Sequence, residues 1–197
     1  MGSLQKPVLV DEVIKWLVPL KGASLTIVDG TVGGGGHAVA LLREIGPSGR
    51  VIGLDRDPAM LALAQQAVDA ASQALGRVLP VNLVHAAYPE IPDVLDELGI
   101  NEVQGVLLDL GLSSDQLAWQ DRGFSFTVDG PLDMRFDPGA PGPTAADLVN
   151  RLPESELASV FFKYGEERFS RRISRRIVEA RQARPIRTTT ELAELVR

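Results

Sequence analysis

A glycine-rich run and an acidic residue after it are the clearest indication of a ligand-binding site in this sequence. The run Val28–His37 contains five glycines and lies between an expected strand and an expected helix. Glycine adopts positive φ angles and lets the backbone approach a ligand closely, and free N–H groups at a helix N-terminus favour an anionic group. Asp55 ends the next expected strand, where a carboxylate can accept hydrogen bonds from a ribose diol. Loop and acid together predict an adenosine-type ligand.

The spacing of the glycines separates two classes of such ligand. Dinucleotide enzymes favour the pattern G-x-G-x-x-G, whereas here Gly30 is followed by the continuous run Gly33–Gly36. A loop without a dedicated pyrophosphate cradle suits the short amino-acid tail of S-adenosylmethionine better. We therefore predict S-adenosylmethionine as the cofactor, and an NAD-linked oxidoreductase is a disfavoured alternative.

A second chemical feature is a cluster of five basic residues, Arg168, Arg171, Arg172, Arg175 and Arg176. Residues four apart share one face of a helix, so the first, third and fifth arginines are expected to align. The whole chain has 20 basic and 26 acidic residues and a net charge of −6, so a basic cluster stands out against it. We predict that it contacts RNA phosphates. A solvated helix face is the alternative.

Alternating strand and helix patterns fill the first half of the chain and would position the glycine loop. Strands are expected at residues 25–28, 51–54, 81–84 and 105–110. Helices are expected at residues 38–45, 57–75 and 91–98, the second of them capped by Asp57 with Pro58 in its first turn. This order predicts an α/β fold with a parallel, doubly wound sheet. The fourth strand is continuous in Val and Leu, so we expect both of its faces to be covered.

The character of the sequence changes near Ser113. Residues 113–143 are rich in Gly and Pro but carry several large apolar side chains, which predicts a long ordered loop rather than a linker. Helices are expected at residues 144–151, 153–164 and 166–184, and a fourth begins at Thr188. In the third of these, Phe169, Ile173 and Ile177 form an apolar stripe that is expected to pack inward.

Two domains follow from this pattern, a core at residues 1–112 and a loop with a helical insert at residues 113–197. Four parallel strands followed only by helices make a lopsided half of a doubly wound sheet. We therefore expect the sheet to be incomplete toward the C-terminus, and the chain to be a fragment.

Several classes of protein are disfavoured by composition. The chain has no cysteine and only two histidines, which excludes disulfides, thiolate zinc sites and multi-histidine metal sites. No apolar run approaches the roughly 18–20 residues that a membrane span needs, and Asp11 and Glu12 interrupt the apolar N-terminal stretch. We expect a cytoplasmic protein without a metal.

The run Asp29–His37 resembles the signature of the MraW/RsmH family, bacterial methyltransferases that modify the N4 amino group of a cytosine in small-subunit (16S) ribosomal RNA. Further blocks resemble the family in the same order along the chain: Lys6–Leu9 with Asp11 and Glu12, Gly53–Pro58, Leu107–Ser114 with Gln116, Arg122–Phe126, Gly130–Arg135 and Tyr164–Arg168. Because the blocks are collinear over nearly the whole chain, chance is a poor explanation.

The resemblance implies a Rossmann-like class I methyltransferase that uses S-adenosylmethionine. It also implies roles for seven residues at the cofactor, which are Gly35, Gly36 and His37 at the amino-acid end, Asp55 at the ribose, Tyr88 beside the adenine, and Asp109 and Gln116 near the methyl group. The family usually has phenylalanine where this chain has Tyr88, a change that preserves stacking. Family members also usually continue with further strands after the helical insert.

The implied partner is 16S ribosomal RNA in the assembled small subunit. No association with a membrane is expected. The oligomeric state is open, and a homodimer is one alternative. Asp109 is the candidate catalytic residue, since an acceptor aimed at the cytosine N–H would orient the nitrogen lone pair for in-line attack. Cofactor binding, or capping of the loop at Gly111, is its alternative role. Alternative functions are a small-molecule or protein methyltransferase, and a non-catalytic ribosome-assembly module that binds the cofactor.

Overall fold

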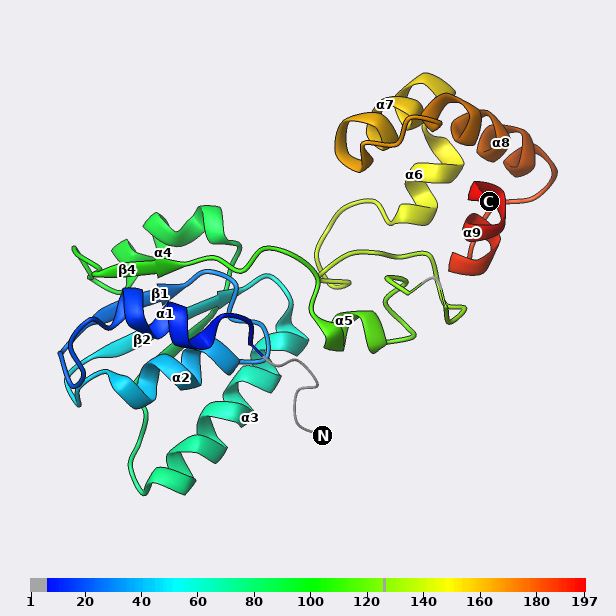
Figure 1. Ribbon diagram of the computed structural model, residues 1–197. Coiled ribbons are helices and arrows are strands. Elements are labelled where there is room, and N and C mark those ends of the chain that lie inside the picture. Colours follow the sequence, from blue (N-terminus) through cyan, green and yellow to red (C-terminus); the bar gives the residue numbers. More distant parts are fainter. Residues whose placement is uncertain (1–6, 126) are drawn as a thin grey trace. The chain divides into compact units, whose positions relative to one another are not determined.

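The computed structural model describes residues 7–125 and 127–197, which form two compact units, Met1–Asp115 and Gln116–Arg197 (Figure 1). Residues Lys6 and Phe126 of the family-like blocks lie outside the described residues. None of the helices in residues 7–125 and 127–197 has the length and apolar character to cross a bilayer.

A four-stranded parallel sheet forms the centre of the first unit, in agreement with the predicted α/β fold. Its strands are β1 (Thr26–Asp29), β2 (Arg50–Asp55), β3 (Val81–His85) and β4 (Gly105–Leu107), in the order β3-β2-β1-β4. The connecting helices are α2 (Gly36–Glu44), α3 (Pro58–Leu75) and α4 (Ile91–Glu97), with the short 3₁₀ helix η1 (Tyr88–Glu90) before α4. Asp57 caps α3 by accepting a hydrogen bond from the N–H of Ala59 over 3.1 Å, as predicted.

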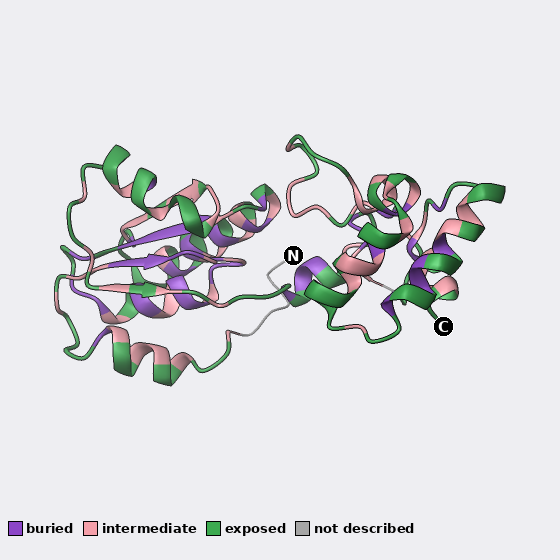
Figure 2. Cartoon of the chain, turned by 90° about the horizontal axis from the view of Figure 1, so that it is seen from above, coloured by how far each residue is buried: buried purple, intermediate pink, exposed green. Residues whose placement is uncertain are grey.

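Helices cover both faces of this sheet. Successive side chains of a strand point to opposite faces, so Ile27 packs with the buried residues of α2 and α3, and its neighbour Val28 packs with those of α4. In Figure 2 the strands run through the buried interior of this unit. Full burial of one such aliphatic side chain stabilises the fold by about 1.5–3 kcal/mol. The core therefore holds rigid the strand ends from which the site projects.

One helix of the first unit was not predicted from the sequence. Helix α1 (Val10–Leu17) is amphipathic, and Val13 and Leu17 pack against the larger apolar cluster of the sheet. Its apolar residues are spaced for a helix, but Asp11 and Glu12 within the first turn obscured the pattern. Acidic residues are favoured there because of the helix dipole.

The fourth strand is shorter and more exposed than predicted. It ends at Leu107 rather than Leu110, and Val106 and Leu108 are exposed. Within the described residues β4 pairs only with β1, so it lies at the edge of the sheet and one side of it has no strand partner. The prediction of a strand covered on both faces was therefore wrong.

The described residues of the second part of the chain form the helices α5 (Ser114–Ala118), α6 (Ala145–Arg151), α7 (Glu154–Gly165), α8 (Ser170–Ala183) and α9 (Thr189–Val196). Helix α5 includes the boundary between the two units. The predicted loop at residues 113–143 therefore contains one short helix. The remaining helices surround a separate apolar core built from Leu132, Val149, Leu157, Ile173, Ile177 and Ile186.

The rest of the loop is ordered by its own contacts, as predicted. Arg122 donates hydrogen bonds to the backbone carbonyls of Arg135 and Phe136. The rings of Phe124 and Phe136 lie 5.5 Å apart, and Arg135 forms an ion pair of 2.8 Å with Asp133. These contacts give the loop a fixed course.

Helix α8 begins four residues later than predicted, and this changes the geometry of the arginine cluster. Glu166 adopts a left-handed conformation (φ 50°, ψ 24°) that ends α7, and Glu167 then accepts a hydrogen bond from the N–H of Phe169 over 2.7 Å. A helix cannot continue through a left-handed residue. Arg168 therefore lies in the turn before α8 and is not aligned on that helix with Arg172 and Arg176.

Candidate functional site

The carboxyl edge of the sheet brings together most of the predicted cofactor residues. The carboxyl ends of parallel strands meet at one edge, where open α/β sheets bind ligands. Asp55 at the end of β2 accepts two backbone hydrogen bonds of 2.9 Å, one from Gly33 to Oδ2 and one from Asp57 to Oδ1. Burial raises the pKa of Asp55. The carboxylate therefore ties the glycine loop to the end of β2.

Asp29, at the end of β1, is the most buried acid of this edge. Its Oδ1 atom accepts a hydrogen bond of 3.2 Å from the N–H of Thr31, whereas Oδ2 is buried and has no partner among the described residues. Burial, reinforced by the nearby carboxylates of Asp55 and Asp109, raises the pKa of Asp29 to about 7. The sequence prediction did not include Asp29 in the site, although an acid at a strand end directly before the glycines was a usable signal.

Two glycines of the loop have structural reasons to be glycine. Gly33 and Gly35 adopt left-handed conformations with φ values of 53° and 84°. A Cβ atom on Gly35 would lie only 2.9 Å from Cα of Ala64 in α3. Gly35 therefore permits the close approach of the loop to α3, whatever contact it makes with a ligand. Gly36 opens α2, and a Cβ atom there would lie 3.0 Å from the ring of Pro7.

His37 is buried at the start of α2 and contacts the N-terminal segment. Its Nε2 atom lies 2.7 Å from the backbone carbonyl oxygen of Val8. Because a carbonyl can only accept, Nε2 carries the proton in this contact. The ring thus fastens residues 7–9 over the beginning of the helix, which is a positioning role.

Tyr88 and Asp109 both lie near the turn at Gly30 and Thr31. Tyr88 opens η1 directly after β3, and its Cβ atom lies 3.1 Å from the position of a Cβ atom on Gly30. The side chain of Tyr88 is 45% exposed. The backbone N–H of Asp109 donates a hydrogen bond of 2.7 Å to Oγ1 of Thr31.

Six predicted residues of the first unit thus lie at or beside one sheet edge: Gly35, Gly36, His37, Asp55, Tyr88 and Asp109. Gln116 is buried and is the first residue of the second unit. The edge contains a carboxyl group at Asp29, whose buried Oδ2 atom has no partner among the described residues, and a second carboxylate at Asp55, which suits a diol. Within residues 7–125 and 127–197, no group of three or more acidic or histidine side chains is arranged to hold a metal ion.

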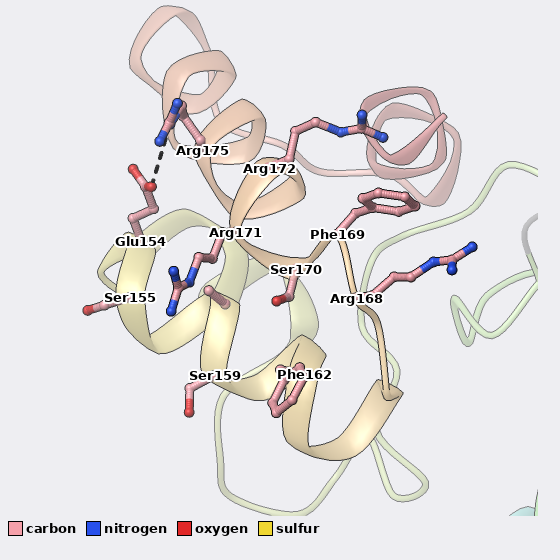
Figure 3. A pocket seen from close by; sticks show the side chains of 11 residues that line it. Glu154, Ser155, Ser159, Phe162, Arg168, Phe169, Ser170, Arg171, Arg172 and Arg175 are labelled. Atoms are coloured by element: carbon pink, nitrogen blue, oxygen red, sulfur yellow. Dashed lines mark ion pairs between the residues drawn. The ribbon is translucent and has the colours of Figure 1, made fainter.

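The second unit contains a basic groove between α7 and α8, with a volume of about 1130 Å³ (Figure 3). Its lining residues, which define the basic groove, are Glu154, Ser155, Ala158, Ser159, Phe162, Arg168, Phe169, Ser170, Arg171, Arg172 and Arg175. Four of the five arginines predicted to contact RNA are therefore together in this groove, and Arg176 is not among its lining residues.

Phe169 differs from its prediction. Ile173 and Ile177 are buried as expected, but Phe169 is 47% exposed. It precedes the first residue of α8, and its ring faces Arg168 and Arg172, whose guanidinium carbons lie 5.2 and 4.6 Å from the ring centroid. Such cation–π contacts hold guanidinium groups in place without neutralising their charge.

Several known proteins are similar to this chain in sequence. Residues 3–197 match the family model described as the MraW methylase family. The chain is 48% identical over 196 residues to the ribosomal RNA small subunit methyltransferase H of Magnetococcus marinus, covering 100% of this chain and 60% of that protein. It is also 48% identical to the protein of that name from Thermobifida fusca, covering 97% of this chain and 56% of the relative.

The chain therefore spans a little over half the length of these curated relatives. Among solved structures, an O-methyltransferase from Bacillus cereus in complex with SAH has a TM-score of 0.44 and 15% identity, over 92% of this chain and 72% of that one. The family match covers nearly every residue, from the N-terminal segment through α9, and so the chain belongs to the MraW methylase family.

Proposed function

We propose that this chain carries the cofactor-binding part of an S-adenosylmethionine-dependent ribosomal RNA methyltransferase, which acts on the N4 amino group of a cytosine in 16S RNA of the small subunit. The observation that carries the proposal is the hydrogen bond from the N–H of Gly33 to Oδ2 of Asp55. It holds the family's glycine signature at the carboxyl edge of the sheet. The substrate, ribosomal RNA, is found in the cytoplasm, and we propose that the protein acts there.

The residues at the sheet edge fit S-adenosylmethionine. Asp55 would accept hydrogen bonds from the ribose, and Tyr88 would stack beside the adenine. Gly35, Gly36 and His37 would lie at the amino-acid end. The Oδ2 atom of Asp29, which has no partner among the described residues, would accept a hydrogen bond from the ammonium group, and the positive charge would favour the ionised carboxylate. When bound, the cofactor supplies an electrophilic methyl group.

Asp109 is the proposed catalytic residue, and the family resemblance gives Gln116 a role near the methyl group. The amino nitrogen of cytosine is a poor nucleophile because its lone pair is delocalised into the ring. A carboxylate that accepts one N–H would oppose this delocalisation and aim the lone pair, so that positioning lowers the barrier. Arg168, Arg171, Arg172, Arg175 and Arg176 would contact the RNA.

Calorimetric titration with S-adenosylmethionine tests the cofactor assignment. We expect saturable binding that NAD does not compete for, and at least a tenfold loss of affinity in Asp55→Ala. Asp69→Ala, which removes an exposed acid of α3, is the matched control and should bind as the unmodified chain does. Absence of binding by the folded unmodified chain, or displacement of the cofactor by NAD, would refute the assignment.

Transfer of a labelled methyl group to small ribosomal subunits that lack the modification tests the substrate assignment. We expect incorporation that is lost in Asp109→Asn when cofactor binding is retained. Cofactor binding together with subunit binding but no transfer by the unmodified chain would instead favour the assembly-module alternative.

A further inference from the structure

We propose that the basic groove binds an unpaired segment of RNA, with one base stacked on Phe162 and the adjoining phosphates held by Arg168, Arg171 and Arg172. The inference rests on the proposed function, which makes RNA the substrate, and it adds the form of RNA that the second unit takes. It also assigns a role to an aromatic residue that no motif singled out.

The charge of the groove favours a polyanion. Of its eleven lining residues four are arginines and only one, Glu154, is acidic. Glu154 lies 3.8 Å from Arg175 and partly neutralises it at one end of the groove, as the dashed line in Figure 3 shows. Among the described residues no ion pair joins Arg168, Arg171 or Arg172 to an acid. Three positive charges thus remain for phosphates in a chain whose net charge is −6.

Phe162 provides an exposed aromatic face. It lies on α7 and is 63% exposed, although burying a phenylalanine ring in the core would stabilise the fold. Apart from Glu154, the groove-lining residues that precede it on α7 have small side chains, which are Ser155, Ala158 and Ser159. Base stacking on such a ring contributes about 1–3 kcal/mol of binding free energy.

Phe169 has a different role from Phe162. Its ring is occupied by Arg168 and Arg172 at 5.2 and 4.6 Å. These contacts order two long side chains before any ligand arrives, so less side-chain entropy is lost on binding. Phe169 therefore orients the phosphate-binding groups, and Phe162 is the ring left to stack.

An aromatic platform beside arginines selects unpaired over paired RNA. In a duplex the base faces are stacked on one another, and proteins recognise its shape and its 2′-hydroxyl and phosphate groups. In a single strand each base presents a free face, and binding combines stacking with phosphate contacts. A single-stranded segment is therefore the better occupant of the groove.

Fluorescence anisotropy with the full 197-residue chain tests the proposal. The probes are a fluorescein-labelled single-stranded 12-nucleotide RNA and a perfectly paired duplex containing the same strand. We expect tighter binding of the single strand, and an affinity loss of about tenfold in Phe162→Leu, which keeps an apolar side chain but removes the stacking face. Arg172→Gln should weaken binding and reduce the slope of log affinity against log salt by about 0.7.

Two matched variants of the second unit control for surface changes that do not touch the groove. Tyr164→Leu removes an aromatic side chain that is 84% exposed, and Arg187→Gln removes one exposed positive charge. Both residues lie outside the groove lining, and both variants should bind the single strand within twofold of the unmodified chain. Thermal melting of each variant confirms that the fold is retained.

Equal affinity of Phe162→Leu and the unmodified chain, or equal binding of duplex and single strand, would overturn the proposal. Displacement of the RNA by polyglutamate at equal charge, with no effect of Phe162→Leu, would make the groove a general contact for acidic partners and would also overturn it. Titration with S-adenosylmethionine keeps the two proposals apart. If only the RNA proposal is wrong, the unmodified chain still binds S-adenosylmethionine. If the cofactor assignment is wrong, the unmodified chain does not bind S-adenosylmethionine, and this titration contains no RNA.

Discussion

The backbone N–H of Gly33 donates a hydrogen bond to Oδ2 of Asp55 over 2.9 Å, and Oδ1 of the same carboxylate accepts the N–H of Asp57 over 2.9 Å. One side chain thus holds the glycine loop and also shapes the turn that leads into α3. A residue expected to bind a ribose is at the same time part of the framework of its own site.

This double role predicts that Asp55→Ala affects stability as well as affinity. Two backbone N–H groups lose their acceptor, so we expect the free energy of unfolding to fall by about 2 kcal/mol. Urea denaturation followed by circular dichroism measures this, with Asp69→Ala as the control. An unchanged urea midpoint in Asp55→Ala would show that the loop does not depend on the carboxylate.

Asp29 predicts a pH-dependent stability of the cofactor-free chain. Burial raises its pKa from 3.8 to about 7 in the folded state, so the folded chain holds a proton that the unfolded chain has released. The contribution of Asp29 to the free energy of unfolding is therefore greatest below pH 4. It falls as the pH rises from about 4 to 7, and it is constant above that. The full effect corresponds to about 4 kcal/mol.

Replacing the acid removes this dependence. Asp29→Asn cannot ionise, so we expect it to be more stable than the unmodified chain at pH 8 and to show little of that advantage at pH 4.5. Thermal melting at the two pH values measures the difference, and Asp93→Asn, which changes an exposed acid, is the control. The same pH dependence in Asp29→Asn and the unmodified chain would assign the effect to other groups.

Gly35→Ala should destabilise the fold more than Gly76→Ala. Both glycines have left-handed conformations, with φ values of 84° and 63°, so both substitutions introduce backbone strain of about 1 kcal/mol. A Cβ atom on Gly35 would in addition lie 2.9 Å from Cα of Ala64, whereas one on Gly76 meets nothing within 4 Å. We expect Gly35→Ala to lose about 2 kcal/mol more in urea denaturation; equal losses would contradict the tight contact.

Glu166→Gly should stabilise the second unit. Glu166 has a left-handed conformation where α7 ends, which glycine adopts without strain. We expect a gain of about 1 kcal/mol, seen as a higher melting temperature. Lys163→Gly, within the last turns of the same helix, should instead lose about 1 kcal/mol. If both changes lowered the melting temperature, the strain at Glu166 would be compensated by contacts of its side chain.

The sheet could be predicted from the sequence because each buried strand is a short apolar run that ends in a residue of different character. Asp29 and Asp55 mark the ends of β1 and β2 in both the prediction and the structure. The limits of β4 could not be predicted, because a Val- and Leu-rich run has the same pattern in a central strand as at an edge. Pairing partners, rather than composition, decide where such a strand ends.

The candidate site was predicted less completely than the fold. Family-like motifs pointed to Asp55, Tyr88 and Asp109. The lack of a partner for Oδ2 of Asp29 among the described residues depends on the three-dimensional structure, and no spacing in the sequence reveals it. Similarly, the arginine pattern predicted a single helix because the residue with the left-handed conformation is Glu166, and not Gly165 directly before it. The basic groove arises from that turn, and it could not be predicted without it.

The exposed edge at β4 has a practical consequence for work with the isolated chain. Val106 in β4, and Leu108 and Leu110 shortly after it, present apolar side chains to water. The outer backbone groups of β4 have no ladder partner among the described residues. Such an edge can recruit the same edge of another molecule. Light scattering should therefore show self-association that grows with protein concentration, and a lysine at position 106 should suppress it without altering the interior of the sheet.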